Sequence, residues 1–269
     1  MALYENQFSE EHDFVGTVEP SKTLVIASTG RSGSHMLGHA LHQTGKFGFP
    51  LEYANPANLE KWRSLLGVSD VADVMTQLKR RRTSSNGVFG IKVHYPHIEQ
   101  FNGFANLLDT FPEPYFVFLS RKDLLKQAVS LSIARQTGVW ISGQESNGVE
   151  PKYDFHQIDG CLKETIRHNA SWKYKLSISG AKYMELDFDK VRMDLKHAIH
   201  QIAQFMEVEL KESDIPVEQV TRKQGNNLNK EWESRFLREC DLEQILYCDS
   251  DHLQKDSLIK AALKRYIKK

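Results

Sequence analysis

Short apolar runs alternate with longer helical patterns along most of the chain. Runs rich in β-branched and aromatic residues predict strands at residues 24–27, 88–93, 115–119 and 182–186. Apolar residues at helical spacing predict helices at residues 35–44, 96–110, 154–179 and 189–206, one starting at 123 and two polar ones within 58–82. Strands that alternate with helices indicate an α/β fold with a mostly parallel central sheet flanked by helices.

The length of the chain suits one domain. Its 269 residues are enough for one large α/β domain with a substantial core. No internal repeat, low-complexity segment or change in composition marks a boundary. We therefore expect a single domain over residues 1–269, in which the polar residues 1–20 form a poorly ordered N-terminal segment.

Overall charge gives no reason to expect a polyanionic partner. The 35 basic and 35 acidic residues cancel, so no global field attracts the protein to nucleic acid or to an anionic membrane. The basic run at residues 79–82 lies near Asp70 and Asp73 in the sequence, and we interpret it as a solvated helix end. Any recognition of an anion must then be local.

The sequence also bears on location. The three cysteines are odd in number and scattered, which suits a reducing compartment, and the acidic N-terminus does not resemble a secretory signal. No apolar stretch approaches the 18 or so residues of a membrane span, so we do not expect an integral membrane protein. These features predict a cytoplasmic protein.

A glycine-bearing loop, TGRSGS, follows the first predicted strand and leads into a helix. Gly30 and Gly33 allow backbone N–H groups to turn toward an anion, and Arg31 supplies a permanent positive charge. Ser32 and Ser34 add hydroxyl donors, and the helix N-terminus adds its dipole. The loop predicts a phosphate or sulfate site, with a plain strand-to-helix turn as the alternative. It is not a Walker A loop, because serine rather than lysine follows the second glycine.

This loop resembles the 5′-phosphosulfate loop of sulfotransferases that use 3′-phosphoadenosine 5′-phosphosulfate (PAPS). Further segments resemble the bacterial trehalose 2-sulfotransferase-like family, namely FPLEY at residues 49–53, FGIK at 89–92, the block at 119–140 and RKQ at 222–224. The matches run in the family's order from about residue 24 to 236. His35 stands where the family usually has serine or threonine, and its imidazole can also donate to the 5′-phosphate.

The resemblance implies a P-loop-like sulfotransferase fold and PAPS as co-substrate, with no metal. It implies that Arg121 and Ser130 hold the 3′-phosphate of the donor. A late loop that closes over the nucleotide is implied at Arg222, Lys223 and Gln224. The expected reaction transfers the sulfuryl group to a hydroxyl of a small acceptor, a sugar or glycolipid, and releases adenosine 3′,5′-bisphosphate.

Sulfuryl transfer needs charge stabilisation at the leaving oxygen and a base for the acceptor hydroxyl. Arg31 and Lys92 are expected to meet the developing negative charge. Two residues compete as the base. Glu52 matches the carboxylate of the trehalose-type enzymes, and His94 falls where cytosolic sulfotransferases of animals and plants carry a catalytic histidine. We favour Glu52, because the surrounding segments match the bacterial branch better.

The acceptor pocket is expected from residues 47–53, 136–140 and 142–153, with Tyr53 and Trp140 against the substrate. No metal-binding motif is evident in the sequence. Two other functions remain open: a P-loop kinase of nucleotides or small molecules, and a catalytically silent protein that binds adenosine bisphosphate. A homodimer through the C-terminal helices is possible.

Overall fold

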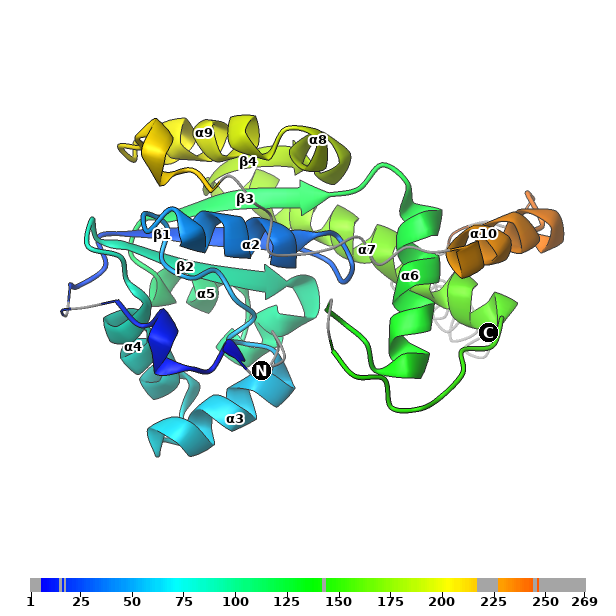
Figure 1. The fold of residues 1–269 in the computed structure, drawn as a ribbon, viewed down its shortest axis with the longest axis horizontal. Helices are drawn as coiled ribbons and strands as arrows, with labels where there is room; N and C mark the ends of the chain where they lie inside the picture. Colours follow the sequence, from blue (N-terminus) through cyan, green and yellow to red (C-terminus); the bar gives the residue numbers. More distant parts are fainter. Residues whose placement is uncertain are drawn as a thin grey trace, which may run out of the picture.

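Four parallel strands form the centre of the structure. The computed structural model describes residues 6–14, 16, 18–141, 144–216, 227–243 and 246. The strands are β1 (Lys22–Ser28), β2 (Val88–His94), β3 (Pro114–Ser120) and β4 (Lys182–Asp187), in the order β2-β1-β3-β4. Figure 1 shows all four pointing toward α6, so that the loops after the strands gather at one edge of the sheet. The predicted α/β architecture is confirmed.

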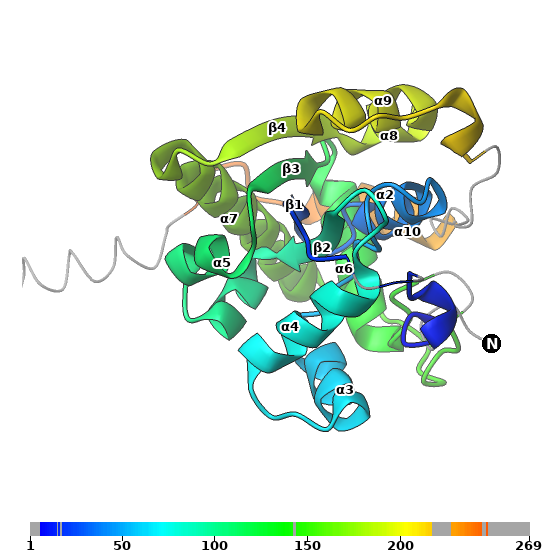
Figure 2. The same cartoon turned by 90° about the vertical axis from the view of Figure 1, so that its left-hand side faces the viewer.

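Helices cover both faces of the sheet (Figure 2). The helices are α2 (Ser34–Gln43), α3 (Pro56–Leu66), α4 (Val71–Arg82), α5 (Phe104–Thr110), α6 (Leu124–Thr137), α7 (Phe155–Ser179), α8 (Phe188–Met193), α9 (Leu195–Met206) and α10 (Asn227–Glu239), with 3₁₀ turns η1 (Glu10–His12), η2 (Tyr95–Phe101) and η3 (Glu212–Asp214). One core joins the sheet to α2, α8 and α9, and the other joins it to α3, α4, α5 and α7. Within the part of the chain that the structure describes, no helix is long and apolar enough to cross a membrane.

Two of the predicted helices are interrupted. The segment predicted at residues 96–110 divides into η2 and α5, because Asn102 and Gly103 both adopt positive φ angles, 57° and 117°. The segment predicted at 189–206 divides into α8 and α9 at Asp194, whose carboxylate accepts a hydrogen bond from the backbone N–H of His197. An aspartate in this place starts a new helix and ends the old one.

Part of the N-terminal segment packs against the domain, which differs from the poor order expected of it. Phe8 is 8% exposed and belongs to the core, with its ring centroid 5.2 Å from that of Trp62. The ammonium of Lys61 lies 4.2 Å from the same ring centroid. Figure 1 shows this segment, in dark blue, beside α3 and α4. The polar composition of the segment did not indicate these contacts, because one aromatic residue, Phe8, makes the apolar contact.

Arg82 is the polar anchor of the same segment. The basic run at 79–82 was expected to be a solvated helix end, yet the Arg82 side chain is completely buried. Its Nε lies 2.7 Å from Oδ1 of Asp13, and its terminal nitrogen donates to the carbonyl of Ser9 at 2.8 Å. The guanidinium also lies 5.6 Å and 5.5 Å from the ring centroids of Phe49 and Trp62. The α4 C-terminus is therefore joined to the N-terminal segment through one buried cation.

We predict that Arg82→Met lowers the free energy of unfolding by about 3 kcal/mol, because it removes the buried donor to the Ser9 carbonyl and one of the two arginines that pair with Asp13. The matched control is Arg80→Met, in the same helical turn, whose side chain is 61% exposed. The control should change the free energy of unfolding by about 0.5 kcal/mol or less. Chemical denaturation measures both variants, and equal effects would contradict the anchoring role.

Candidate active site

The loop after β1 is shaped for close approach of an anion. Gly33 has φ 89° and caps α2 without any side-chain hydrogen bond to the first turn. A Cβ on Gly33 would lie 1.9 Å from the ring of Phe188, so only glycine fits there. The first-turn N–H groups of α2 therefore lack a side-chain cap, and residues 33–36 line a cleft. Uncapped N–H groups at a helix start bind anions.

One cleft of about 920 Å³ brings together most of the predicted site. It is lined by both of the predicted anion-binding arginines, Arg31 and Arg121. Its wall also includes Ser130 on α6, Lys92 on β2 and Glu52, which precedes α3. Residues that lie far apart in the sequence thus meet at the carboxyl edge of the sheet, where open α/β folds bind their ligands.

The Arg31 side chain reaches across this cleft to Ser130 on α6 and to Trp140. Its backbone is left-handed, with φ 62°. Its Nε donates to the hydroxyl of Ser130 at 3.0 Å, and Nη1 donates to the carbonyl of Trp140. Burial, together with the nearby charge of Arg121, lowers the pKa of Arg31 to about 10, so the side chain stays cationic near neutral pH. Two guanidinium groups that repel each other in one cleft are stabilised by a bound anion.

Arg121 follows β3 and lacks a full set of partners. Its guanidinium lies 4.3 Å from the ring centroid of Phe188. Its Nε is buried and has no hydrogen-bond partner among the described residues. Burial lowers the pKa of Arg121 from its ordinary value, and the carboxylate of Asp189 partly opposes this. A buried donor without an acceptor is costly, and an oxyanion of a ligand would satisfy it.

Helix α6 is tied to the glycine loop by a residue that carried no predicted role. Gln127 is fully buried, and its amide donates to Oγ1 of Thr29 at 2.8 Å and to the carbonyl of Gly30 at 2.7 Å. The predicted N-cap of the helix is present, since Asp123 accepts from the N–H of Lys126 at 3.0 Å. Gln127 therefore holds the glycine loop and α6 in one unit. A glutamine at a helical apolar position was the available signal.

The opposite wall carries the two base candidates beside Lys92. The Lys92 ammonium lies 2.7 Å from Oε1 of Glu52, and Nε2 of His94 lies 3.4 Å from the same oxygen. Burial alone raises the pKa of the Glu52 carboxyl, but His94 and the Lys92 charge outweigh it and hold the pKa below its usual range. Burial lowers the pKa of His94 to about 3, although Glu52 acts in the other direction. Near neutral pH this site holds a carboxylate and a neutral imidazole.

His97 completes this cluster, and no sequence motif pointed to it. Its Nδ1 accepts a hydrogen bond from the backbone N–H of His94 at 3.4 Å, and the two rings stack with centroids 5.1 Å apart. Across the described ranges, donor atoms of Glu52, His94 and His97 all lie within 4.8 Å of one another, which is close enough for a metal ion. The Lys92 ammonium already stands against the carboxylate, where such an ion would bind. We therefore interpret the cluster as a site for proton transfer and not for a metal ion.

His35 and Trp140 line the cleft as expected. The His35 ring packs against that of His39 with centroids 4.4 Å apart, and its buried Nε2 has no hydrogen-bond partner within the described ranges. Burial, with the nearby Lys92 charge, holds the pKa of His35 well below its ordinary value, so its imidazole is neutral near neutral pH. Trp140 is 43% exposed and presents an open aromatic surface.

Other predicted site residues lie elsewhere. Tyr53 is 1% exposed, donates its hydroxyl to the carbonyl of Phe49 at 2.6 Å and packs in the core, so it does not contact a substrate in the cleft. Ser32 is fully buried beneath the loop and does not line the cleft. Both predictions were based on the chemistry of the side chain. In the structure, the backbone directs these two side chains into the protein interior. The late-loop residues 222–224 lie outside the described residues.

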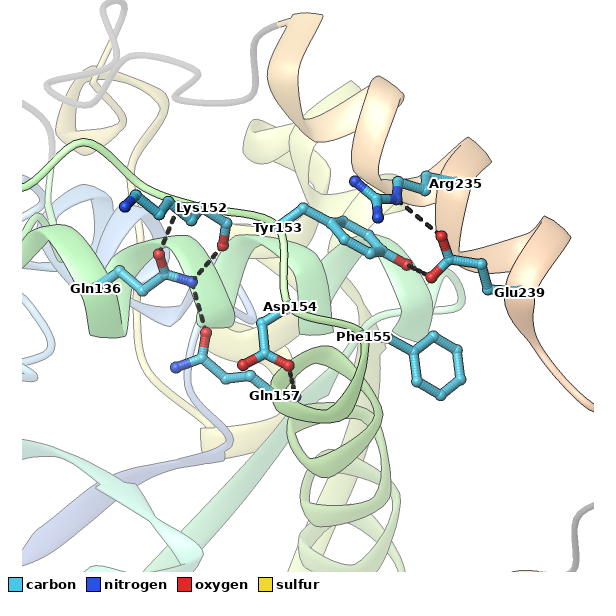
Figure 3. Close-up of a pocket in the computed structure, with 8 residues that line it drawn as sticks. All are labelled: Gln136, Lys152, Tyr153, Asp154, Phe155, Gln157, Arg235 and Glu239. Carbon is cyan, nitrogen blue, oxygen red and sulfur yellow. Dashed lines mark hydrogen bonds and ion pairs between the residues drawn. The ribbon is translucent and has the colours of Figure 1, made fainter.

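Part of the expected acceptor segment lines a separate surface pocket of about 460 Å³, shown in Figure 3. The Gln136 amide donates to the carbonyl of Lys152 and accepts from its N–H, at 2.9 Å and 2.7 Å. Tyr153 points to α10, where its hydroxyl donates to Glu239 at 3.0 Å and the Arg235 guanidinium lies 3.9 Å from its ring centroid (Figure 3). These residues fasten the loop to α6 and α10. Of the described residues in the expected acceptor segments beyond residue 136, the larger cleft is lined by Gly138, Trp140, Ile141 and Gln144.

The sequence profile of a known family decides the assignment. The profile described as Stf0 sulphotransferase matches residues 23–239, which is most of the chain. The chain belongs to the Stf0 sulphotransferase family. This span holds the glycine loop, Glu52, Lys92 and Arg121, so the sulphotransferase match covers every wall of the cleft just described except its N-terminal edge. No curated protein sequence matches this sulphotransferase significantly.

Solved sulfotransferase structures resemble the chain at low identity. The sulfotransferase domain of the Synechococcus PCC 7002 olefin synthase has 13% identity and a TM-score of 0.45, covering 89% of this chain and 95% of that domain. Mouse sulfotransferase SULT7A1, complexed with PAP, has 12% identity and a TM-score of 0.46, covering 85% and 69%. Mycobacterium tuberculosis STF1 has 11% identity and a TM-score of 0.45, covering 86% and 80%. At these scores the family assignment rests on the profile match.

Proposed function

We propose that this sulphotransferase moves the sulfuryl group of PAPS to a hydroxyl of a small acceptor, a sugar or glycolipid, and releases adenosine 3′,5′-bisphosphate. The observation that carries the proposal is the shared cleft of Arg31 and Arg121, with the uncapped start of α2 beside them. A nucleotide with phosphate groups on two sides of its ribose offers one anion to each of two separate anchors. Family membership supports the same reaction class.

We assign the 5′ end of the donor to the glycine loop and the 3′-phosphate to Arg121 and Ser130. The uncapped N–H groups at the start of α2, with the Ser34 hydroxyl, would bind the 5′ oxygens. The buried Nε of Arg121 would gain an acceptor. The Ser130 hydroxyl accepts a hydrogen bond from Arg31, and its own proton would be donated to the 3′-phosphate. We expect residues 222–224 to cover the nucleotide, as in the family.

In the transfer step, the bond between sulfur and the bridging oxygen of the 5′-phosphate breaks, and a bond from sulfur to the acceptor oxygen forms. Arg31 and Lys92 would stabilise the charge that develops on the leaving oxygen. Glu52 would take the proton of the acceptor hydroxyl. Lys92 stands 2.7 Å from Glu52, so an ammonium drawn toward the sulfuryl group leaves a more basic carboxylate. The three residues then act in one step.

Glu52 is the better base on this geometry, and His94 is the alternative. Both residues line the cleft, and in the ligand-free site the pKa of both is lowered, that of Glu52 by His94 and Lys92 and that of His94 by burial. Movement of the Lys92 ammonium to the sulfuryl group would raise the pKa of Glu52, whereas the burial of His94 would remain. Trp140, exposed in the same cleft, offers a stacking surface for a sugar ring. We also propose that the reaction needs no metal, because Arg31 and Lys92 supply the positive charge, and that the protein is cytoplasmic.

The first prediction concerns the reaction itself. With EDTA, radiolabelled PAPS and a panel of sugars and glycolipids, the protein should produce a labelled acceptor and stoichiometric adenosine 3′,5′-bisphosphate. The cleft residues supply the positive charge, so chelation should not reduce the rate. A P-loop kinase would instead consume ATP and require Mg²⁺. A silent binding protein would bind the bisphosphate and transfer no label.

The second prediction separates the two base candidates. Glu52→Gln should lower kcat by about 10²-fold or more, because it removes the proton acceptor but keeps the shape of the side chain. His94→Asn should lower kcat less than about tenfold, since the imidazole neighbours the base. Both variants should bind adenosine 3′,5′-bisphosphate like wild type, which calorimetry measures. The opposite order of effects would make His94 the base.

A further inference from the structure

The N-terminal segment supplies a wall of the cleft. Gln7 is 5% exposed and lines the cleft together with Asn55 and Asn58, which lie at the start of α3. Across the described residues no hydrogen bond is made to its side-chain amide, and neither amide atom is fully buried, so the amide keeps its remaining exposure toward the cleft. A nearly buried amide without a protein partner hydrogen-bonds to whatever fills the cleft, water or ligand. An amide in this state that faces a substrate cleft is available to a ligand.

Gln7 is held in place by its backbone and by its neighbours. The Arg82 guanidinium donates to the carbonyls of Gln7 and Ser9, at 3.4 Å and 2.8 Å. Phe8, the next residue, packs in the core against Trp62. These contacts fix the main chain at residues 7–9. A ligand that hydrogen-bonds to Gln7 therefore pays little of the entropy that ordering a loose terminus would cost.

The same end of the cleft holds the proposed base. The Nδ2 of Asn58 donates to the Glu52 carbonyl at 3.0 Å, and the Nδ2 of Asn55 lies 3.4 Å from Oε2 of the Glu52 carboxylate. Both asparagines thus already serve Glu52, whereas Gln7 does not. A group that hydrogen-bonds to Gln7 would lie beside the hydroxyl whose proton Glu52 accepts. That position belongs to the acceptor and not to the nucleotide.

We propose that Gln7 hydrogen-bonds a second hydroxyl of the acceptor, next to the one that is sulfated. A carboxamide both donates and accepts, which matches a hydroxyl, and it carries no charge, which suits a neutral polyol. An acceptor with one isolated hydroxyl would displace water from the amide without replacing its hydrogen bond, and would be used less well. This inference rests on the proposed function and makes the N-terminal segment part of acceptor specificity.

The test is Gln7→Leu, which keeps the buried volume nearly constant and removes the hydrogen bond. The probes are trehalose, which has neighbouring hydroxyls, and cyclohexanol, which has one. With saturating PAPS, the variant should raise the KM for trehalose about tenfold, the effect of one lost neutral hydrogen bond, with kcat changed less than about threefold. The preference of wild type for trehalose over cyclohexanol should shrink by the same factor. The affinity for adenosine 3′,5′-bisphosphate should not change.

The matched control is Gln204→Leu, an exposed glutamine on α9 that does not line the cleft, which should leave every value unchanged. An unaltered KM in Gln7→Leu would overturn the inference, as would a joint loss of thermal stability and bisphosphate affinity, which marks a structural role. Wild type that binds the bisphosphate yet uses no polyol would overturn the role of Gln7 and spare the donor site. Wild type that fails to bind the bisphosphate would overturn both proposals.

Discussion

Repulsion between cations in one cleft is the constraint on which the site depends. Arg31 and Arg121 share a cavity with Lys92 and with the uncapped start of α2, although the protein as a whole carries no net charge. Without a ligand, Arg31 bonds to Ser130 and to a carbonyl, and Lys92 pairs with Glu52. Under the proposed function, the oxyanions of the donor would replace these contacts, so donor binding and the release of Glu52 from Lys92 would be coupled.

The sheet and its edge could be predicted from the sequence for a definite reason. Buried parallel strands are continuous apolar runs, and the residues after them meet at one edge. The family resemblance then implied that Arg31 and Arg121 act together at that edge. The breaks at Asn102 and Asp194 were not foreseen, because backbone dihedral angles and helix caps override apolar spacing locally. Both segments are helical, as predicted, but each is divided in two and not one continuous helix.

Side-chain direction is what the sequence could not supply. Tyr53 and Ser32 have suitable chemistry and point into the protein. Gln127 and His97 lacked a recognised motif, yet Gln127 contacts the glycine loop and His97 contacts His94. The N-terminal segment was misjudged for a related reason: its composition is polar, yet its partner is a buried arginine that only the tertiary structure brings to it. Long-range pairing of this kind leaves no local signal.

The most direct test of the central claim measures where each phosphate binds. Calorimetry would compare adenosine 3′,5′-bisphosphate, adenosine 5′-monophosphate and adenosine 3′-monophosphate on wild type, Arg31→Ala and Arg121→Ala. The account predicts that Arg121→Ala loses about tenfold or more in affinity for the two ligands that carry a 3′-phosphate and keeps its affinity for adenosine 5′-monophosphate. Arg31→Ala should lose as much for the two ligands that carry a 5′-phosphate and keep its affinity for adenosine 3′-monophosphate. Either variant binding the bisphosphate as tightly as wild type would contradict it.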